Sequence, residues 1–187
     1  KKNLVIVING QLRTWSTAKK SFAKFCSHLK EKYQVSVIFN TWKDSYLNRA
    51  KDPTTPHKVV RTNEQRFDAD DLKLTIESDL SAMGLASWSV YVYDQEHVKA
   101  TKLKGMLWDE EYDLISFLRF QSVQNLKIHE MLNSVRFDEV LFSRPDLWYH
   151  VNRDVANSVE MKPLKDFDLF MMGDLQRREN AYWGDLP

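Results

Sequence analysis

Two short apolar runs on either side of an amphipathic segment most constrain the fold of this chain. LVIVI at 4–8 and VSVIF at 35–39 are rich in β-branched residues, which is typical of strands buried on both faces of a parallel sheet. Thr14 or Ser16 can cap a helix that runs to about Tyr33. Its apolar face would consist of Ala18, Phe22, Phe25, Cys26 and Leu29. A strand, a helix and a strand in this order predict a βαβ unit with parallel strands.

The same alternation continues along the chain. Residues 43–66 are polar and contain two prolines, so they predict an excursion from the core, and residues 94–108 predict a basic, irregular connection. Helices are expected at 69–83, capped by Asp68, and at 109–134. The apolar positions of the second helix would be Leu114, Phe117, Leu118, Val123, Leu126 and Met131. Further strands are expected at 89–93, 139–143 and 168–172. This pattern predicts one α/β, Rossmann-like domain over residues 1–187, with a mainly parallel or mixed sheet of about six strands flanked by helices.

Charge and cysteine content exclude several classes of protein. The chain has 187 residues and a net charge of +1, so neither sign of charge indicates nucleic acid or a membrane surface as a partner. One cysteine excludes an internal disulfide framework, and we expect Cys26 to be buried and inert. No apolar run is long enough to span a membrane, and no signal peptide precedes the first strand, so we expect a cytoplasmic location. We also expect the protein to be a monomer. The missing initiator methionine suggests one domain of a longer protein.

Polar residues follow every predicted strand. In open α/β sheets, ligands bind beyond the carboxyl ends of the strands, where the strand order reverses. The polar segments there are Asn9–Thr14, Asn40–Lys43, Asp94–Gln95, Arg144–Asp146 and Gly173–Asp174. Amides and Trp42 suit a base, Arg13 suits a phosphate, and Asp146 suits a metal or a ribose. Each can equally be an ordinary loop residue, and Trp42 can be a packing residue.

Asp146 is the strongest single candidate. Pro145 fixes its own φ and biases Arg144 toward an extended conformation, so both charged side chains are expected at the edge of the sheet. Mn²⁺ or Mg²⁺ often takes only one or two protein carboxylates when phosphates supply other ligands. The alternative is a surface ion pair between Arg144 and Asp146, worth at most about 1 kcal/mol.

Other motifs indicate structural roles. Asp68 and Asp70 lie where a helix begins, so capping explains their spacing. Asp166 and Asp168 precede a strand, on the opposite edge from a ligand site. His28 and His129 lie in helices without metal-ligand spacing, and we expect them to be structural. No G-x-G-x-x-G, G-x-x-x-x-G-K or G-x-S-x-G motif is present.

Three blocks resemble a known family. NLVIVINGQLRTW (3–15), VIFNTW (37–42) and RFDEVLFSRPDLWY (136–149) resemble small nucleotide-sugar glycosyltransferases of the GT-A fold. The openings of that group read like I-x-G-x-x-R-T, their second strands end like H-T-W, and their metal strand ends like R-x-D-L. The chain looks closest to the compact glycosyltransferase domain encoded by large algal (chlorella) viruses, which would place it in the host cytoplasm.

The resemblance implies a GT-A-like domain that binds a UDP-sugar donor. Carried over by position, the pocket for uridine and diphosphate would be lined by Gln11, Arg13, Thr14, Asn40, Thr41, Trp42 and Asp94. Arg119 and Gln121 would contact the donor sugar. Asp146 would be the last aspartate of the family's Asp-x-Asp metal motif. Arg144 stands where the first aspartate is expected, a departure that puts strict metal dependence in doubt.

The implied reaction is transfer of a sugar to a hydroxyl of a glycan or glycoprotein acceptor. A metal on Asp146, with Arg13, would stabilise the charge on the departing phosphate. An inverting enzyme needs a base, for which Asp174 and Asp185 are the candidates, and Trp148 and Trp183 could stack on sugar rings or pack in the core. A sugar nucleotidyltransferase, a non-catalytic nucleotide- or glycan-binding module and a metal nuclease are the alternatives; the net charge speaks against the nuclease.

Overall fold

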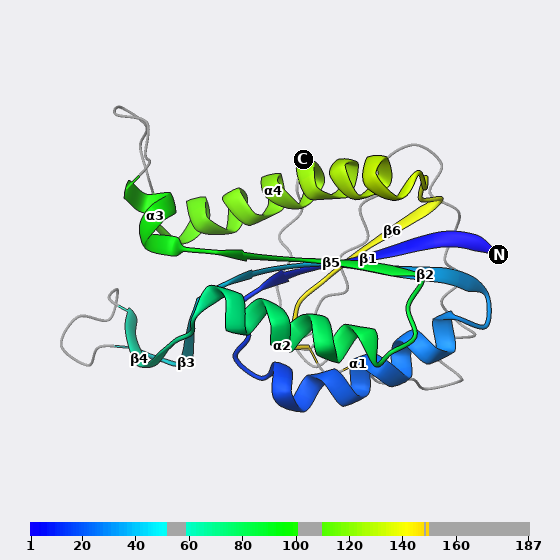
Figure 1. Cartoon of the computed structure of the whole chain (residues 1–187). Helices are drawn as coiled ribbons and strands as arrows, with labels where there is room; N and C mark the ends of the chain where they lie inside the picture. Colours follow the sequence, from blue (N-terminus) through cyan, green and yellow to red (C-terminus); the bar gives the residue numbers. More distant parts are fainter. Residues whose placement is uncertain (52–58, 101–109, 148, 150–187) are drawn as a thin grey trace, which may run out of the picture.

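Four parallel strands form the central sheet of the computed structural model, which describes residues 1–51, 59–100, 110–147 and 149 (Figure 1). The strands are β1 (Lys2–Gly10), β2 (Tyr33–Trp42), β5 (Ser87–Tyr93) and β6 (Glu139–Ser143), in the order β5-β2-β1-β6. The predicted Rossmann-like α/β class is therefore confirmed.

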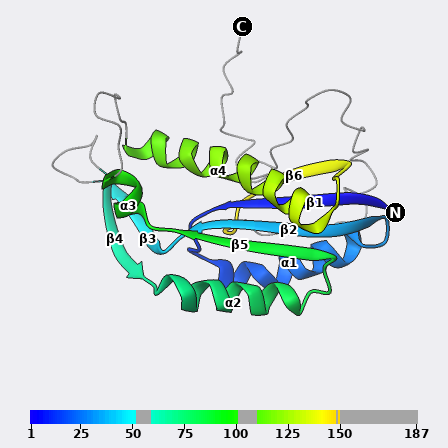
Figure 2. The same cartoon turned by 45° about the horizontal axis from the view of Figure 1, so that its top comes forward.

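Helices cover both faces of this sheet. The helices α1 (Trp15–Leu29) and α2 (Ala69–Ser81) lie on one face, and α4 (Glu110–Asn133) lies on the other (Figures 1 and 2). The chain winds outward from β1 through β2 to β5 and then returns to place β6 beside β1. The strand order consequently reverses between β1 and β6, where open α/β sheets bind ligands.

The core has two unequal parts because β1 is buried on both faces. Leu4, Ile6 and Ile8 pack into the larger cluster with α1 and α2, whereas Val5 and Val7 face α4. This is the burial that the β-branched run predicted. Cys26 is fully buried in the larger cluster, and burial raises the pKa of its thiol to about 12. The predicted burial is therefore confirmed, and the inertness of the thiol stays a prediction.

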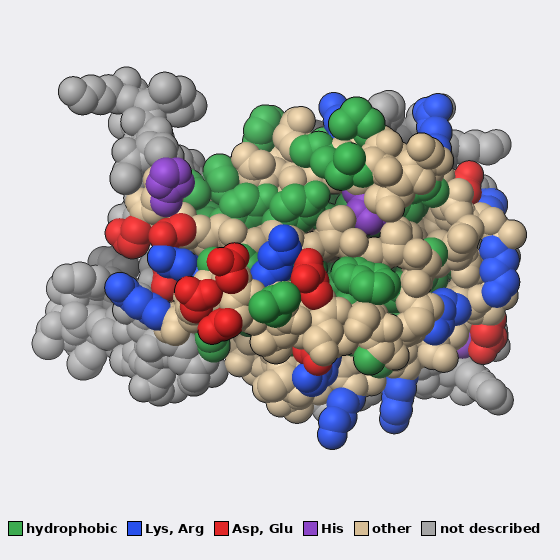
Figure 3. Space-filling model, in the orientation of Figure 1, with side chains coloured by type: hydrophobic (Ala, Val, Ile, Leu, Met, Phe, Trp, Pro, Cys, Tyr) green, Lys and Arg blue, Asp and Glu red, His purple; other side chains and the backbone are tan. Residues whose placement is uncertain are grey.

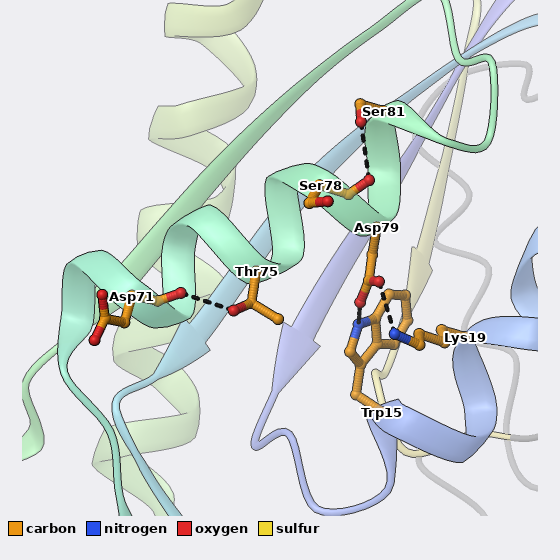
Figure 4. Close-up of polar contacts among 7 residues, drawn as sticks. All are labelled: Trp15, Lys19, Asp71, Thr75, Ser78, Asp79 and Ser81. Atoms are coloured by element: carbon orange, nitrogen blue, oxygen red, sulfur yellow. Dashed lines mark hydrogen bonds and ion pairs between the residues drawn. The ribbon is translucent and has the colours of Figure 1, made fainter.

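One acidic side chain ties α1 to α2. Asp79 on α2 accepts a hydrogen bond from the Trp15 indole at 3.0 Å and pairs with Lys19 at 2.7 Å (Figure 4). At the start of α2, Asp68 accepts hydrogen bonds from the amides of Asp70 and Asp71 at 2.9 and 3.1 Å. The capping role predicted for Asp68 is confirmed.

Several sequence-based boundaries need correction. The polar excursion contains an antiparallel hairpin, β3 (Asp44–Lys51) and β4 (Val59–Arg66), which forms a sheet of its own. The described residues give the central sheet four strands, all parallel, where about six in a parallel or mixed sheet were expected, and 168–172 lie outside the described part. A short helix, α3 (Gln95–Ala100), occupies the start of the expected irregular connection. α1 ends at Leu29, because the chain turns there into β2, and Thr14 makes no side-chain cap.

The predicted apolar face of α4 is right at four of its six positions, since Phe117 and Leu126 also pack against the core. Leu114 and Leu118 are buried, but Val123 is 41% exposed and Met131 is 71% exposed. The inward stripe is continued by Ser122, Asn125 and His129, which are all buried. Within the described residues, no helix is long and apolar enough to cross a membrane.

Candidate functional site

The loops that follow β1 and β6 touch at the point where the strand order reverses. Gly10 has a φ of +144°, and a Cβ built on it would lie 3.1 Å from Cδ of Pro145. Only glycine adopts such a backbone conformation easily, and the missing side chain lets the two loops approach. The NGQLRT and RPD segments are therefore neighbours, as the sequence predicted.

Arg144 and Asp146 form a two-point ion pair across Pro145. Nε of Arg144 donates to Oδ1 of Asp146 at 2.9 Å, and Nη2 donates to Oδ2 at 2.6 Å. The Arg144 side chain is 61% exposed, whereas the Asp146 side chain is 15% exposed. The ion pair considered as the alternative for these residues is thus present, and it engages both carboxylate oxygens.

Tyr149 anchors the far end of this loop. Its ring packs against Phe22 and Phe25 of α1, and its backbone amide donates to Oγ of Ser21 at 3.1 Å. Its hydroxyl lies 2.5 Å from Oγ of Ser143 and donates to the Arg144 carbonyl at 3.0 Å. Burial raises the pKa of this phenol, so the hydroxyl stays protonated. The Arg-Pro-Asp bend is held at both ends.

The loop after β1 supplies a cation beside this bend. Nε of Arg13 donates to the side-chain oxygen of Gln11 at 3.1 Å, and both residues are half-buried. Thr14 is exposed at the N-cap position of α1. Gln11 and Arg13 thus lie on the same edge as Arg144 and Asp146, in the loop that Gly10 brings against Pro145.

A buried network of amides and hydroxyls lies under the edge, between the sheet and α4. Nδ2 of Asn40 donates to Oδ1 of Asn9 at 3.0 Å, and Oδ1 of Asn40 accepts from Nδ2 of Asn125 at 2.7 Å. Ser122 donates to Oδ1 of Asn9 at 2.6 Å, and Asn125 also donates to the Tyr93 hydroxyl at 2.7 Å. Asn40 is therefore fully buried with both ends of its amide engaged, and it supports the edge from below.

Thr41 and Trp42 are also buried. Oγ1 of Thr41 donates to the Gly10 carbonyl at 2.8 Å and so ties β2 to the junction. Trp42 is 3% exposed and stacks on Phe117 of α4, with ring centroids 5.8 Å apart. This is the packing role considered as the alternative for Trp42. A ligand contact for Asn40, Thr41 or Trp42 stays a prediction.

An ion pair joins the residues that follow β2 and β5 at the same edge of the sheet. Nζ of Lys43 lies 2.5 Å from Oδ2 of Asp94, and Oδ1 of Asp94 accepts the amide of Glu96 at 2.9 Å as a cap of α3. The hydrogen bond from Lys43 lowers the pKa of Asp94, and Asp94 in turn raises the pKa of Lys43. Gln95 beside them is 2% exposed, and its amide oxygen finds no hydrogen-bond partner in the part of the chain that is described. A buried acceptor of this kind costs about 1–3 kcal/mol.

The remaining predicted site residues lie apart from the junction or outside the description. Arg119 is exposed and Gln121 is half-buried on α4, in the turn directly after Leu118. Leu118 packs in the same apolar cluster as Trp42. Asp174 and Asp185, the candidate bases, lie outside the described residues, as do Trp148 and Trp183. The structure therefore brings Gln11, Arg13, Arg144 and Asp146 to one place and Asp94 to another along the same edge.

Sequence reasoning missed the supporting residues. Ser122, Asn125 and His129 of α4 continue the stripe of Leu114 and Leu118 at helical spacing, which is the signal that could have found them. Polar residues in an inward stripe indicate a buried hydrogen-bonded network, since unpaired polar groups are seldom buried. Tyr149 gave no such signal.

Few carboxylates gather at the junction to hold a divalent cation. Among the described residues, no group of three or more His, Cys, Asp or Glu side chains could hold a metal ion. Within the described part of the Gly10–Pro145 junction the carboxylate is that of Asp146, and Arg144 donates to both of its oxygens. In this arrangement both oxygens are engaged by Arg144, and a metal-binding role for Asp146 stays a prediction.

Comparison with known proteins adds no assignment. No protein-family model, no curated protein and no solved structure matches this chain.

Proposed function

We propose that this chain is a nucleotide-sugar glycosyltransferase of GT-A type, which transfers a sugar from a UDP-sugar donor to a hydroxyl of a glycan acceptor. The observation that carries the proposal is the contact between Gly10 and Pro145 at the reversal of strand order. It joins two of the three sequence blocks that resemble such transferases at the edge where open α/β sheets bind ligands.

The charges at this junction suit a diphosphate. Arg144 is a largely exposed guanidinium on a bend that Tyr149 anchors, and Arg13 lies in the neighbouring loop. Guanidinium groups bind phosphate oxygens through paired, charge-assisted hydrogen bonds. Fixed cations beside the leaving diphosphate would stabilise the charge that develops when the sugar departs.

Asp146 then has a role without a metal. By pairing with Arg144 it would orient the guanidinium, and a phosphate would compete with it for the same donors. Mn²⁺ at Asp146, the expectation from the family resemblance, requires Arg144 to turn away first. Arg144 is exposed and can do so, but the Asp146 side chain left behind is only 15% exposed, so the cation would have to neutralise its charge.

The test is thermal unfolding with UDP, GDP, CMP and ADP, each with and without Mn²⁺. A ligand at 100 times its dissociation constant adds about 2.7 kcal/mol, which raises the midpoint by roughly 5–10 °C in a domain of this size. We expect a shift with UDP that survives chelation of divalent cations. A shift only with Mn²⁺ would restore Asp146 as a metal ligand, and no shift with any nucleotide would refute the proposal.

Two substitutions separate these cases. Arg144→Ala should weaken UDP binding by about 10- to 100-fold, the worth of charge-assisted hydrogen bonds. Arg136→Ala is the matched control, because Arg136 is exposed at the opposite end of β6. Asp146→Ala should leave UDP binding unchanged or tighter if the carboxylate competes for Arg144. It should abolish binding if the carboxylate holds a cation.

A non-catalytic nucleotide-binding module is the second candidate, favoured by the closed Arg144–Asp146 pair. It would bind UDP as the transferase does. Incubation with a panel of UDP-sugars distinguishes the two, because a transferase releases UDP slowly when water takes the sugar and quickly when an acceptor hydroxyl takes it. Binding without UDP release from any donor would favour the module.

A further inference from the structure

The outer strand β5 is the edge of the sheet within the described residues. Its sequence, SWSVYVY, contains no charge and no proline, and Trp88 is 37% exposed. Natural sheets usually protect such edges with lysine, proline, bulges or a covering element. Figure 3 views the molecule from this side, with hydrophobic side chains above the edge and mixed charges below it.

The backbone groups that face outward can be identified from one hydrogen bond. The carbonyl of Tyr93 accepts from the amide of Lys43, the residue directly after β2, at 2.9 Å, so Tyr93 directs its backbone groups inward. Because these directions alternate along a strand, Trp88, Val90 and Val92 direct theirs away from the sheet. Val90 is the middle of the three.

Two charged residues of α2, Lys73 and Glu77, lie below the β5 edge, one on each side of the level of Val90. Asp79 of α2 faces α1 (Figure 4), and at 100° per residue Lys73 and Glu77 lie on the opposite flank, toward the outside of β5. They are 4.0 Å apart and partly exposed. Their midpoint, Thr75, lies about 9 Å back from the end of α2, and Val90 lies about 10 Å on from the start of β5. Only residues 82–86 separate the end of α2 from the start of β5, which places the two midpoints at about the same height.

We propose that the β5 edge is an interface with a second copy of this chain, related by a two-fold axis at Val90. Antiparallel pairing would place Trp88 opposite Val92 of the other copy and join the two sheets. On the α2 side, Lys73 would meet Glu77 of the other copy, and the reverse. The two-fold axis thus creates two contacts between opposite charges, Lys73 of each copy with Glu77 of the other, and the surface is complementary to itself. The inference replaces the expected monomer and does not depend on the proposed function.

Sedimentation velocity on the full chain, from about 1 to 200 µM, tests the proposal. We expect the wild type to dimerise over this range and Trp88→Lys to remain a monomer, because lysine on an edge strand opposes pairing. Val123→Lys is the matched control: Val123 is an exposed apolar residue on α4, and this variant should dimerise as the wild type does. A wild type that stays monomeric, or a dimer that Trp88→Lys leaves intact, overturns the proposal.

A charge exchange tests the two-fold register. Lys73→Glu should weaken dimerisation about tenfold, because two attractive contacts become repulsive. The double variant Lys73→Glu/Glu77→Lys should restore it. If the double variant is as weak as the single one, the charges do not meet across a two-fold axis. Hydrogen exchange gives an independent readout if Trp88→Lys does not fold: the amides of Trp88, Val90 and Val92 should gain protection with concentration, and unchanged exchange overturns the pairing.

Discussion

Replacing Gly10 by alanine tests the junction of β1 and β6 directly. The φ of +144° at Gly10 lies outside even the left-handed helical region that L-residues occasionally occupy. The new Cβ would also lie 3.1 Å from Cδ and 3.6 Å from Cγ of Pro145. Pro145 belongs to a bend anchored by Tyr149, so the ring has little room to withdraw.

The expected loss of stability follows from three contributions. A non-glycine residue in a disfavoured backbone region costs about 1–3 kcal/mol, and the contact with Pro145 adds to this. Alanine restricts the unfolded chain, which offsets about 0.4–1 kcal/mol. The net expectation is a loss of about 2 kcal/mol. At roughly 2–4 °C per kcal/mol for a chain of this length, the unfolding midpoint should fall by about 4–8 °C.

Urea unfolding of Gly10→Ala, with Gly84→Ala as the control, measures this loss. Gly84 has a φ of +61°, and the nearest atom to a Cβ there is the terminal nitrogen of Lys30 at 3.4 Å. Its variant should lose about 1 kcal/mol. The double variant Gly10→Ala/Pro145→Ala should recover part of the loss through removal of the contact. If Gly10→Ala costs no more than Gly84→Ala, the two loops do not hold each other as described.

Three further outcomes are expected. Burial lowers the pKa of His129, so the folded state keeps it neutral. Stability should be full above pH 6.5, the ordinary His value, and fall below it as the unfolded chain takes up the proton. Urea midpoints from pH 8 to 5 should show a shallower fall in His129→Gln, and equal slopes would contradict this. Ser134 ends α4 with a φ of +49°, so Ser134→Gly should raise the free energy of unfolding by about 0.5–1 kcal/mol, and a loss would contradict the assignment. Cys26 should react with a thiol reagent only after denaturation, since its pKa is raised to about 12; rapid labelling of the native chain would show that it is accessible.

The elements that could be predicted from the sequence are those with a clear local signal, such as a buried apolar run or a helix cap. The β-branched runs of β1 and β2 and the Asp68 cap of α2 each have one dominant local cause, and all three are confirmed. The β3–β4 hairpin was missed because a two-stranded ribbon outside the core needs no apolar alternation. The outward side of α4 was misjudged at Val123 and Met131 because helical spacing does not say which apolar stripe faces the sheet.

The candidate site was predicted as a list of loop residues and not as an arrangement. Strand ends gave Gln11, Arg13, Arg144 and Asp146, because parallel strands deliver their carboxyl ends to one edge. The contact between Gly10 and Pro145, and the anchor at Tyr149, depend on packing between segments far apart in the chain. No local pattern encodes either contact.

The polar stripe on α4 fixes the longitudinal position of that helix. A purely apolar face could slide along the sheet by one turn, about 5.4 Å, and repack with modest loss. Ser122, Asn125 and His129 each have a separate polar partner on the strands, at Asn9, Asn40 and the pair Ser87 and Ser89. A one-turn slip would break all of these hydrogen bonds at once and leave buried groups unpaired. These hydrogen bonds therefore allow α4 only one position along the sheet. We expect any conformational adjustment to a bound ligand to occur in the loops at the edge of the sheet.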